Sequence, residues 1–201
     1  MKKASLLVLF FVITILSFAQ VNDTHTRHGK IGLTFSSLGS ADGLSFAKGA
    51  ASYTGDGFYA FGLNYLYVLN NTFDFETGCE YAHYTMTIHP NVPPDADDTP
   101  YDINYSLISI PLSFRVNFLK YCFMNGGLDL DFDPTVSNPI GSQDGIGSVL
   151  GLGLKYDSKS GIPVFVNPYF KVHRLIPFSQ SNGSPRILES AFRFGIMYTL
   201  K

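Results

Sequence analysis

The feature that most constrains this chain is an alternation of side-chain character with a period of two residues. Between Tyr59 and Leu69, every second residue is large and apolar, whereas the residues between them are smaller and mixed. The pattern recurs at 108–118 and again at 188–200. Because successive side chains of a β-strand point to opposite faces, this period predicts strands with one apolar face. We expect strands near 29–38, 57–69, 72–88, 103–119, 121–132, 146–157, 162–173 and 188–200.

The connections between these segments alternate in length. Asn70-Asn71, Lys120 and the segment 158–161 are short, whereas the other four connections are much longer and rich in Gly, Pro, Ser, Asn and Asp. Barrels of bacterial outer membranes have short periplasmic turns and long extracellular loops. The sequence therefore predicts an all-β fold: an eight-stranded antiparallel up-and-down transmembrane β-barrel with both termini in the periplasm.

The direction in which the apolar faces point separates two classes of barrel. A soluble barrel of the lipocalin type would turn these faces inward, but the interior of an eight-stranded barrel holds only packed side chains or one small ligand. The apolar faces carry too many large side chains for that space, and the opposite faces carry small residues such as Gly62, Gly78 and Gly195. We therefore expect the apolar faces to meet lipid, with a soluble binding barrel as the alternative.

Tyrosine is the candidate for the aromatic girdles that mark the two membrane interfaces, because the chain has no Trp. The candidates on the apolar phase or at its ends are Tyr59, Tyr65, Tyr67, Tyr81, Tyr121, Tyr156 and Tyr198.

The first nineteen residues have the three parts of a secretory signal peptide. Lys2 and Lys3 precede an apolar run from Leu6 to Leu16, and Ser17-Phe18-Ala19 places small residues before Gln20. An uncleaved anchor is the alternative, but the run is shorter than the about 20 residues of a membrane-spanning helix. We expect cleavage after Ala19, a flexible tail at 20–28 and a barrel domain at 29–201.

Composition and charge exclude two classes of protein. The formal net charge is −2 and no basic run occurs, so the chain lacks the electrostatic features of a nucleic-acid binder. Only 15% of the residues are charged and a further 15% are aromatic, which is the opposite of a disordered chain.

Charged residues fall on the inward phase of the predicted strands, where burial requires them to pair. We expect Arg115 and Arg193 to bind some of Glu76, Glu80 and Asp129, and the network to plug a narrow lumen. A conducting path along the same charges is the alternative. The predicted lumen charges are Glu76, Glu80, Arg115, Asp129, Lys171 and Arg193, together with Asp74, Asp131, Lys155, His173 and Glu189.

No motif indicates a cofactor, a metal or a catalytic site. The pairs His25/His28 and His83/His89 lack further residues at ligand spacing. An enzyme would need His with Ser or Asp at the loop rim, and no motif joins the candidates there, which are His83, His89, Asp102, His173 and Ser179. We expect no cofactor and no enzyme.

The two cysteines lie on the apolar phase of the third and fifth predicted strands. The intervening strand would hold their backbones about 9–10 Å apart, whereas a disulfide needs Cα atoms within about 7 Å. We expect Cys79 and Cys122 to be free thiols that face lipid.

Three segments resemble one protein family. The leader end Ser17-Phe18-Ala19-Gln20 is similar to signal peptides of Bacteroidetes, and 108–118 resembles the "I-P-L" strand of their outer-membrane β-barrel domain proteins, followed by an aromatic and glycine pair at 121–127. The last strand, 192–200, resembles the signal read by the barrel assembly machinery, although Lys201 follows it. The resemblance implies a small porin-family barrel like OmpX or OmpA, with no active site to carry over.

These observations together predict a protein of the cell outer membrane. Its partners would be outer-membrane lipids, the barrel assembly machinery and other envelope proteins. We expect a structural or binding role through the extracellular loops or as a partner subunit. A narrow porin-like channel for small solutes and a loop-rim enzyme are the alternatives.

Overall fold

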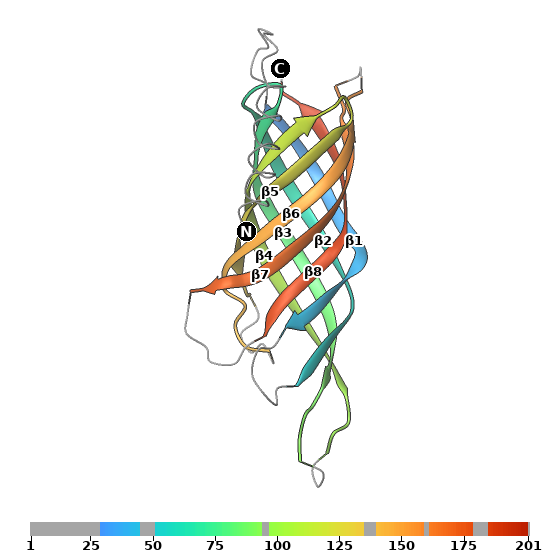
Figure 1. The fold of residues 1–201 in the computed structure, drawn as a ribbon, viewed down its shortest axis with the longest axis vertical. Coiled ribbons are helices and arrows are strands. Elements are labelled where there is room, and N and C mark those ends of the chain that lie inside the picture. Colours follow the sequence, from blue (N-terminus) through green and yellow to red (C-terminus); the bar gives the residue numbers. More distant parts are fainter. Residues whose placement is uncertain are drawn as a thin grey trace, which may run out of the picture.

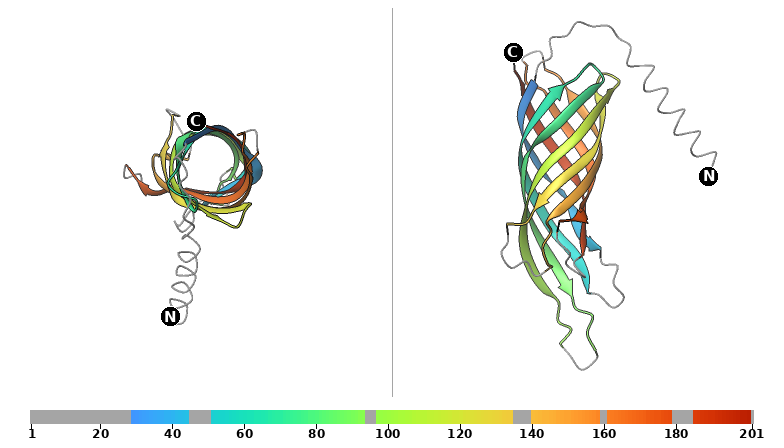
Figure 2. Two further views of the ribbon diagram at one scale, coloured as in Figure 1. Left: turned by 90° about the horizontal axis from the view of Figure 1, so that it is seen from above. Right: turned by 90° about the vertical axis from the view of Figure 1, so that its left-hand side faces the viewer.

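In the computed structural model the chain forms a closed β-barrel (Figures 1 and 2). The structure describes residues 29–44, 51–93, 97–134, 140–158, 161–178 and 185–200. The predicted signal peptide, 1–19, and the predicted tail, 20–28, lie outside them. No helix in this part of the chain is long and apolar enough to cross a membrane.

Within the described residues, eight antiparallel strands make the barrel wall, and each strand pairs with its neighbours in chain order. β8 returns to pair with β1, from Lys30 opposite Thr199 to Leu44 opposite Arg186, and this pairing closes the barrel. The predicted fold class is confirmed. The strands are β1 (Gly29–Leu44), β2 (Ser52–Val68), β3 (Phe73–His89), β4 (Tyr101–Phe118), β5 (Cys122–Phe132), β6 (Gly145–Tyr156), β7 (Val164–Pro177) and β8 (Arg186–Thr199).

The two ends of the barrel differ in their connections. The turns β2–β3, β4–β5 and β6–β7 gather at one end with Gly29 and Thr199, and we call this the short-turn end (Figure 1). In the β2–β3 turn, the side chain of Asn70 accepts hydrogen bonds of 2.8 Å from the backbone N–H groups of Thr72 and Phe73. The longer connections lie at the opposite end, the loop end, where the β3–β4 hairpin projects furthest (Figure 1).

Three strands are longer at the loop end than the alternation predicts. β1 continues to Leu44 rather than 38, β2 begins at Ser52 rather than 57, and β7 continues to Pro177 rather than 173. The predicted ends were wrong because each strand is irregular there, with register shifts beside Ser37, beside Gly55 and opposite Ile146. A bulge inserts a residue and changes which face the following side chains occupy, so the alternation is interrupted although the strand continues.

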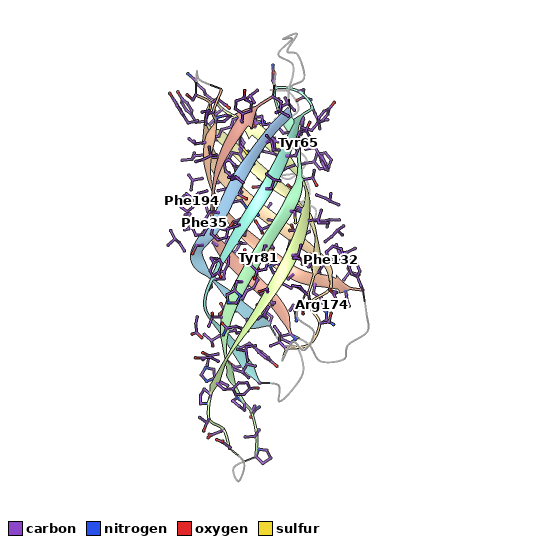
Figure 3. All side chains as sticks on the ribbon, turned by 180° about the vertical axis from the view of Figure 1, so that it is seen from behind. Phe35, Tyr65, Tyr81, Phe132, Arg174 and Phe194 are labelled. Atoms are coloured by element: carbon purple, nitrogen blue, oxygen red, sulfur yellow. The ribbon has the colours of Figure 1, made fainter. Side chains whose placement is uncertain are left out.

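The exterior of the barrel is a band of large apolar side chains (Figure 3). The apolar members of every strand's outward phase are exposed or half-buried: Leu33 on β1 is 68% exposed, Phe61 on β2 is 57% exposed and Ile196 on β8 is 61% exposed. Phe35, Tyr65 and Phe194 stand away from the wall in the same way (Figure 3). The predicted outward orientation of the bulky side chains is therefore confirmed.

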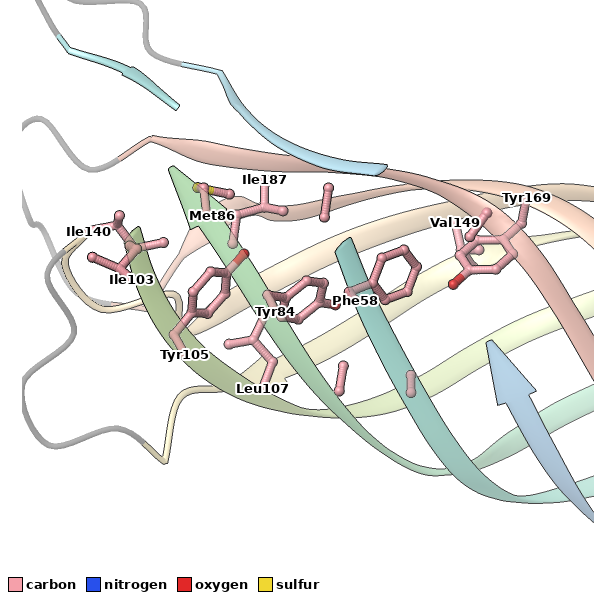
Figure 4. Packing of buried hydrophobic residues seen from close by; sticks show 14 of the residues in the cluster. Phe58, Tyr84, Met86, Ile103, Tyr105, Leu107, Ile140, Val149, Tyr169 and Ile187 are labelled. Atoms are coloured by element: carbon pink, nitrogen blue, oxygen red, sulfur yellow. The ribbon is translucent and has the colours of Figure 1, made fainter. Parts of the chain in front are cut away.

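The interior contains large apolar side chains in addition to the predicted small and charged ones, and their clusters were not predicted. A cluster at the loop end includes Phe58, Tyr84, Tyr105, Leu107 and Ile187, with the rings of Tyr84 and Tyr105 stacked 4.9 Å apart (Figure 4). A smaller cluster near the short-turn end consists of Leu66, Phe123, Phe165 and Met197. We call these the loop-end cluster and the turn-end cluster.

Two adjacent glycines of β5 provide a test of this inside–outside geometry. A Cβ on Gly127, which faces inward, would lie 2.3 Å from the carbonyl oxygen of Leu112 and 2.4 Å from Cα of Ser113, both in the backbone of β4. A Cβ on Gly126, which faces outward, would meet nothing nearer than Leu150 Cδ1 at 3.4 Å. We expect Gly127→Ala to lower the free energy of unfolding by about 1–3 kcal/mol through overpacking.

The matched control is Gly126→Ala, which we expect to change the free energy of unfolding by less than about 0.5 kcal/mol. The measurement is urea unfolding of both refolded variants in detergent micelles. Equal effects of the two substitutions would contradict the assigned orientation of β5.

Candidate functional site

The candidate site is the set of polar and charged side chains enclosed by the barrel, between the two apolar clusters. All six predicted lumen charges point inward and are at most 4% exposed. Asp74, Asp131, His173 and Glu189 are also buried, whereas Lys155 is half-buried at the short-turn end. Nine of these side chains form three charged layers, and they come from β3, β4, β5, β7 and β8. They are Glu76, Glu80, Asp129, Asp131, Glu189, Arg115, Lys171, His173 and Arg193.

The layer nearest the short-turn end is organised around Arg115. Its Nη2 donates to Glu76 Oε2 at 2.7 Å, and its guanidinium lies over the rings of Phe123 and Phe165, at 4.1 and 4.7 Å from their centroids. The other oxygen of Glu76 accepts a hydrogen bond of 2.9 Å from Asn64 Nδ2. Burial between two aromatic faces strengthens the attraction of a cation for the rings, so Arg115 is fixed by both a carboxylate and the turn-end cluster.

The middle layer joins Arg193 and Lys171 to Glu80. Lys171 Nζ donates to Glu80 Oε1 at 2.7 Å, while Arg193 Nη2 lies 3.5 Å from Glu80 Oε2 and its Nη1 lies 3.8 Å from Glu76 Oε1. The guanidinium of Arg193 also lies over Tyr169, 4.9 Å from the ring centroid. Lys171 Nζ is 3.9 Å from Asp129 Oδ1. Arg193 therefore connects the two glutamates, and Asp129 lies at the edge of the network.

The layer nearest the loop end is organised around His173. Its Nδ1 lies 3.0 Å from Asp131 Oδ2, and its Nε2 lies 3.1 Å from Glu189 Oε2. Ser109 donates to Asp131 at 2.6 Å, and Tyr84 donates to Glu189 at 2.5 Å. An ionised carboxylate at each ring nitrogen favours the doubly protonated ring, because neutral imidazole has only one donor.

Sequence reasoning missed the tyrosines of this layer. The hydroxyl of Tyr169 donates to Glu189, as does that of Tyr84, and both rings are buried. The available signal was their position: Tyr84 has the same inward phase as Glu80, and Tyr169 the same as Lys171. These two tyrosines connect the charged layers to the loop-end cluster, of which both are members.

The mouth at the short-turn end is bridged by exposed ion pairs. Asp157, in the β6–β7 turn, lies 3.0 Å from Lys30 Nζ on β1 and 3.7 Å from Lys155 Nζ. Partial burial favours the neutral acid, but the two lysines outweigh it and hold the pKa of Asp157 below its usual range. A small pocket lies there, and its lining includes Lys30, Asp74, Arg115, Lys155 and Asp157.

The residues considered for catalysis do not come together in the part of the chain that the structure describes. His173 was expected at the loop rim but is buried in the lumen, because β7 extends beyond it. His83 bonds to Ser106 on the barrel exterior at 3.1 Å, and Asp102 accepts from Thr87 at 2.8 Å. Ser179 lies outside the described residues.

The metal and disulfide candidates can be placed in the same way. His25 and His28 lie outside the described residues, and the described ones include no group of three His, Cys, Asp or Glu side chains arranged to hold a metal ion. Cys79 is exposed and Cys122 half-buried on the outward phase, and both are free thiols, as expected.

Comparisons with known proteins return folds rather than close relatives. No family model matches the chain, and no curated protein matches it. The outer membrane protein AlkL, solved by solid-state NMR in DMPC lipid bilayers, shares 11% identity over 91% of this chain and 94% of its own, with a TM-score of 0.47.

Two crystal structures are similar at the same level. The N-terminal β-barrel domain of Pseudomonas aeruginosa OprF shares 13% identity over 87% of this chain and 100% of its own, with a TM-score of 0.42. Ail, the attachment invasion locus protein of Yersinia pestis, was solved with the heparin analogue sucrose octasulfate; it shares 12% identity over 86% of this chain and 99% of its own, with a TM-score of 0.41. These likenesses concern the fold alone, which the strand pairing above establishes independently.

The pair Arg115–Glu76 predicts a large stability effect. Arg115→Met removes the short ion pair and leaves the buried Glu76 with only the hydrogen bond from Asn64 and the longer contact with Arg193, so we expect a loss of about 3–5 kcal/mol in the free energy of unfolding. The double variant Arg115→Met/Glu76→Gln removes both charges and should recover part of the loss. The measurement is a double-mutant cycle from urea unfolding in detergent micelles.

The control is the ion pair at the mouth. Lys30→Met breaks the contact with the half-exposed Asp157, for which we expect a loss of less than about 1 kcal/mol. If Arg115→Met cost no more than Lys30→Met, the sealed character of the charged layers would be refuted.

Proposed function

We propose that this protein is an integral outer-membrane barrel with a closed lumen, which acts through its loop end or as a partner subunit in the envelope. The observation that supports this proposal is the inverted polarity of the barrel wall. Large apolar side chains cover the exterior, while the nine ionisable side chains of the charged layers, which come from five strands, are buried inside. A water-soluble barrel would be stabilised by the reverse arrangement, whereas lipid requires this one.

The limits of the apolar band support a membrane location. At the short-turn end, Tyr67 ends the outward phase of β2, Tyr156 ends that of β6 and Tyr198 lies next to the end of β8. Towards the loop end the band gives way to polar pairs on β3 and β4, with Thr85 bonded to Asn104 and Thr87 to Asp102, both at 2.8 Å. Tyrosines at one limit and hydrogen-bonded polar pairs at the other are what two water interfaces require.

The closed lumen supports a role other than transport. The loop-end cluster lies on one side of the charged layers and the turn-end cluster on the other. Within those layers most of the charges contact each other directly. The interior of an eight-stranded barrel is only wide enough for side chains or one small ligand, and here side chains occupy it. The parts free to meet other molecules are then the loops and the exterior, so the partners would be outer-membrane lipids, the barrel assembly machinery and other envelope proteins.

Several finer expectations belong to this proposal. Secretion would use the leader at 1–19, and the chain would belong with the Bacteroidetes outer-membrane β-barrel proteins that its strands resemble. No enzymatic activity is proposed. A narrow channel is the second candidate, favoured by the charged layers, which extend through the middle of the barrel.

Cell fractionation with heat-modifiable gel mobility tests the location. We expect the protein in the outer-membrane fraction, extractable only with detergent, and running at different positions before and after boiling because the closed barrel resists the gel's detergent. A variant that lacks residues 186–201 cannot form the β1–β8 pairing and should lose the heat-dependent shift. Recovery of the intact chain from the periplasm without detergent would overturn the proposal in favour of a soluble barrel.

Planar-bilayer recording separates the closed lumen from the channel. We expect no sustained single-channel current from protein whose folding has been verified by the gel shift, because side chains occupy the bore. A steady, open current in such a preparation would instead establish the channel alternative.

A further inference from the structure

Within the three charged layers, which we call the sealed layers, the charges balance except for one carboxylate. Asp74 is also buried, but it lies outside these layers, at the short-turn mouth, where it accepts a hydrogen bond of 2.7 Å from Asn117 Nδ2. Glu76 pairs with Arg115 and Glu80 with Lys171, while Arg193 lies between these two glutamates. His173, protonated on both nitrogens, bridges Asp131 and Glu189. Four carboxylates therefore face four cations. Asp129 is the fifth carboxylate of the sealed layers.

Asp129 is also the carboxylate with the poorest contacts. It has no exposed surface, and neither oxygen accepts a hydrogen bond from any residue that the structure describes. Its nearest cation, Lys171 Nζ, is 3.9 Å away and is engaged with Glu80 at 2.7 Å. By contrast, Asp131 accepts from both His173 and Ser109.

Among the residues that the structure describes, two cations act on Asp129. The charged groups with which it interacts electrostatically are Glu80 from β3, Asp131 from β5, Lys171 from β7 and Arg193 from β8. The neighbouring strands place Pro111 of β4 and Gly147 of β6 opposite it, and neither has a side chain that donates a hydrogen bond. Two of the four facing charges are negative, and both cations are bound to Glu80.

We propose that Asp129 is a proton-binding site of the lumen, occupied at neutral pH when the barrel is folded. A proton from bulk water binds one carboxylate oxygen and converts the group into a neutral acid with one O–H donor. An isolated buried charge is so costly that a carboxyl group neutralises instead when no cation compensates it. With this proton, the sealed layers are electrically neutral.

The bound proton links stability to pH. In the unfolded chain Asp129 is in water and ionised at neutral pH, so the folded protein holds about one more proton at this position than the unfolded protein does. Stability falls with rising pH where the folded state binds more protons. Release of the proton from the folded barrel would place a fifth negative charge next to Glu80 and Asp131. For this reason the folded barrel loses stability as the pH rises.

Infrared difference spectroscopy tests the proposal directly. The folded wild-type protein in detergent at neutral pH should show the carbonyl stretch of a protonated carboxyl, and Asp129→Asn should remove it. The matched control is Asp131→Glu, two residues along the same strand, which keeps the charge count of these layers and should leave that band in place. Persistence of the band in Asp129→Asn, or its absence from the wild type, would overturn the assignment.

The pH dependence of unfolding gives a second, independent measurement. Above neutral pH, the unfolding equilibrium constant of the wild type should rise by up to about tenfold more per pH unit than that of Asp129→Asn, as one linked proton requires. Parallel pH profiles for the two proteins would refute the linkage.

Because both measurements use folded protein in detergent, they do not depend on where the protein resides in the cell. If Asp129→Asn did not fold, the pH titration of the Asp carboxyl ¹³C shifts of the wild type would decide.

Discussion

The pairing of β8 with β1 is the constraint on which the rest of this structure depends. Closure gives every strand two hydrogen-bonded neighbours, so no sheet edge remains in the wall, and a hydrocarbon surrounding could not satisfy such an edge. Closure also creates an inside of fixed and small width. Once the inside exists, the alternation of each strand assigns every side chain either to a confined lumen or to the exterior, and the two surfaces must differ in chemistry.

In the confined lumen, each cation makes more than one stabilising contact. Arg115 has a carboxylate and two aromatic faces, and Arg193 has two carboxylates and the ring of Tyr169. Desolvating such groups costs several kcal/mol each, and only good geometry with additional hydrogen bonds offsets that cost. The buried tyrosines contribute here because their rings pack with the apolar clusters while their hydroxyls bond to Glu189. The charged layers and the apolar clusters are therefore one continuous packed core.

Much of this arrangement could be predicted from the sequence, because it follows from local pattern. The period of two residues predicts the strands, the alternation of short and long connections predicts their up-and-down order, and the inward phase contains Glu76, Glu80, Arg115 and Lys171. Their exact partners could not be predicted, because pairing across the lumen depends on the stagger of the strands around the closed barrel. That Asp129 is one carboxylate more than the cations balance becomes evident only when every cation has been assigned to its partners.

The sequence rule fails at the loop end in two ways, through a change of apolar phase and through irregular strands. The sequence rule assumes that one phase of a strand stays apolar along its whole length, but β3 changes phase: its outward residues are apolar at Phe75 and polar at Thr85 and Thr87, while its inward residues change from Glu80 to Met86. β1 and β7 are interrupted near the same end by Leu38 and Arg174, which have positive φ.

On the loop-end side of this change, β3 and β4 have the ordinary polarity of a soluble protein, with Met86 and Ile103 inside and Thr87 and Asn104 outside. On the short-turn side the polarity is inverted. A change of apolar phase within an unbroken strand therefore marks the height at which the exterior passes from hydrocarbon to water, and it can be read in the sequence of β3 without knowledge of the fold. In this chain that height is near His83, between the exposed ring of Tyr81 and the hydrogen-bonded Thr85. The strands that continue beyond it enclose the loop-end cluster, so the same residues that extend the wall into water also close the lumen.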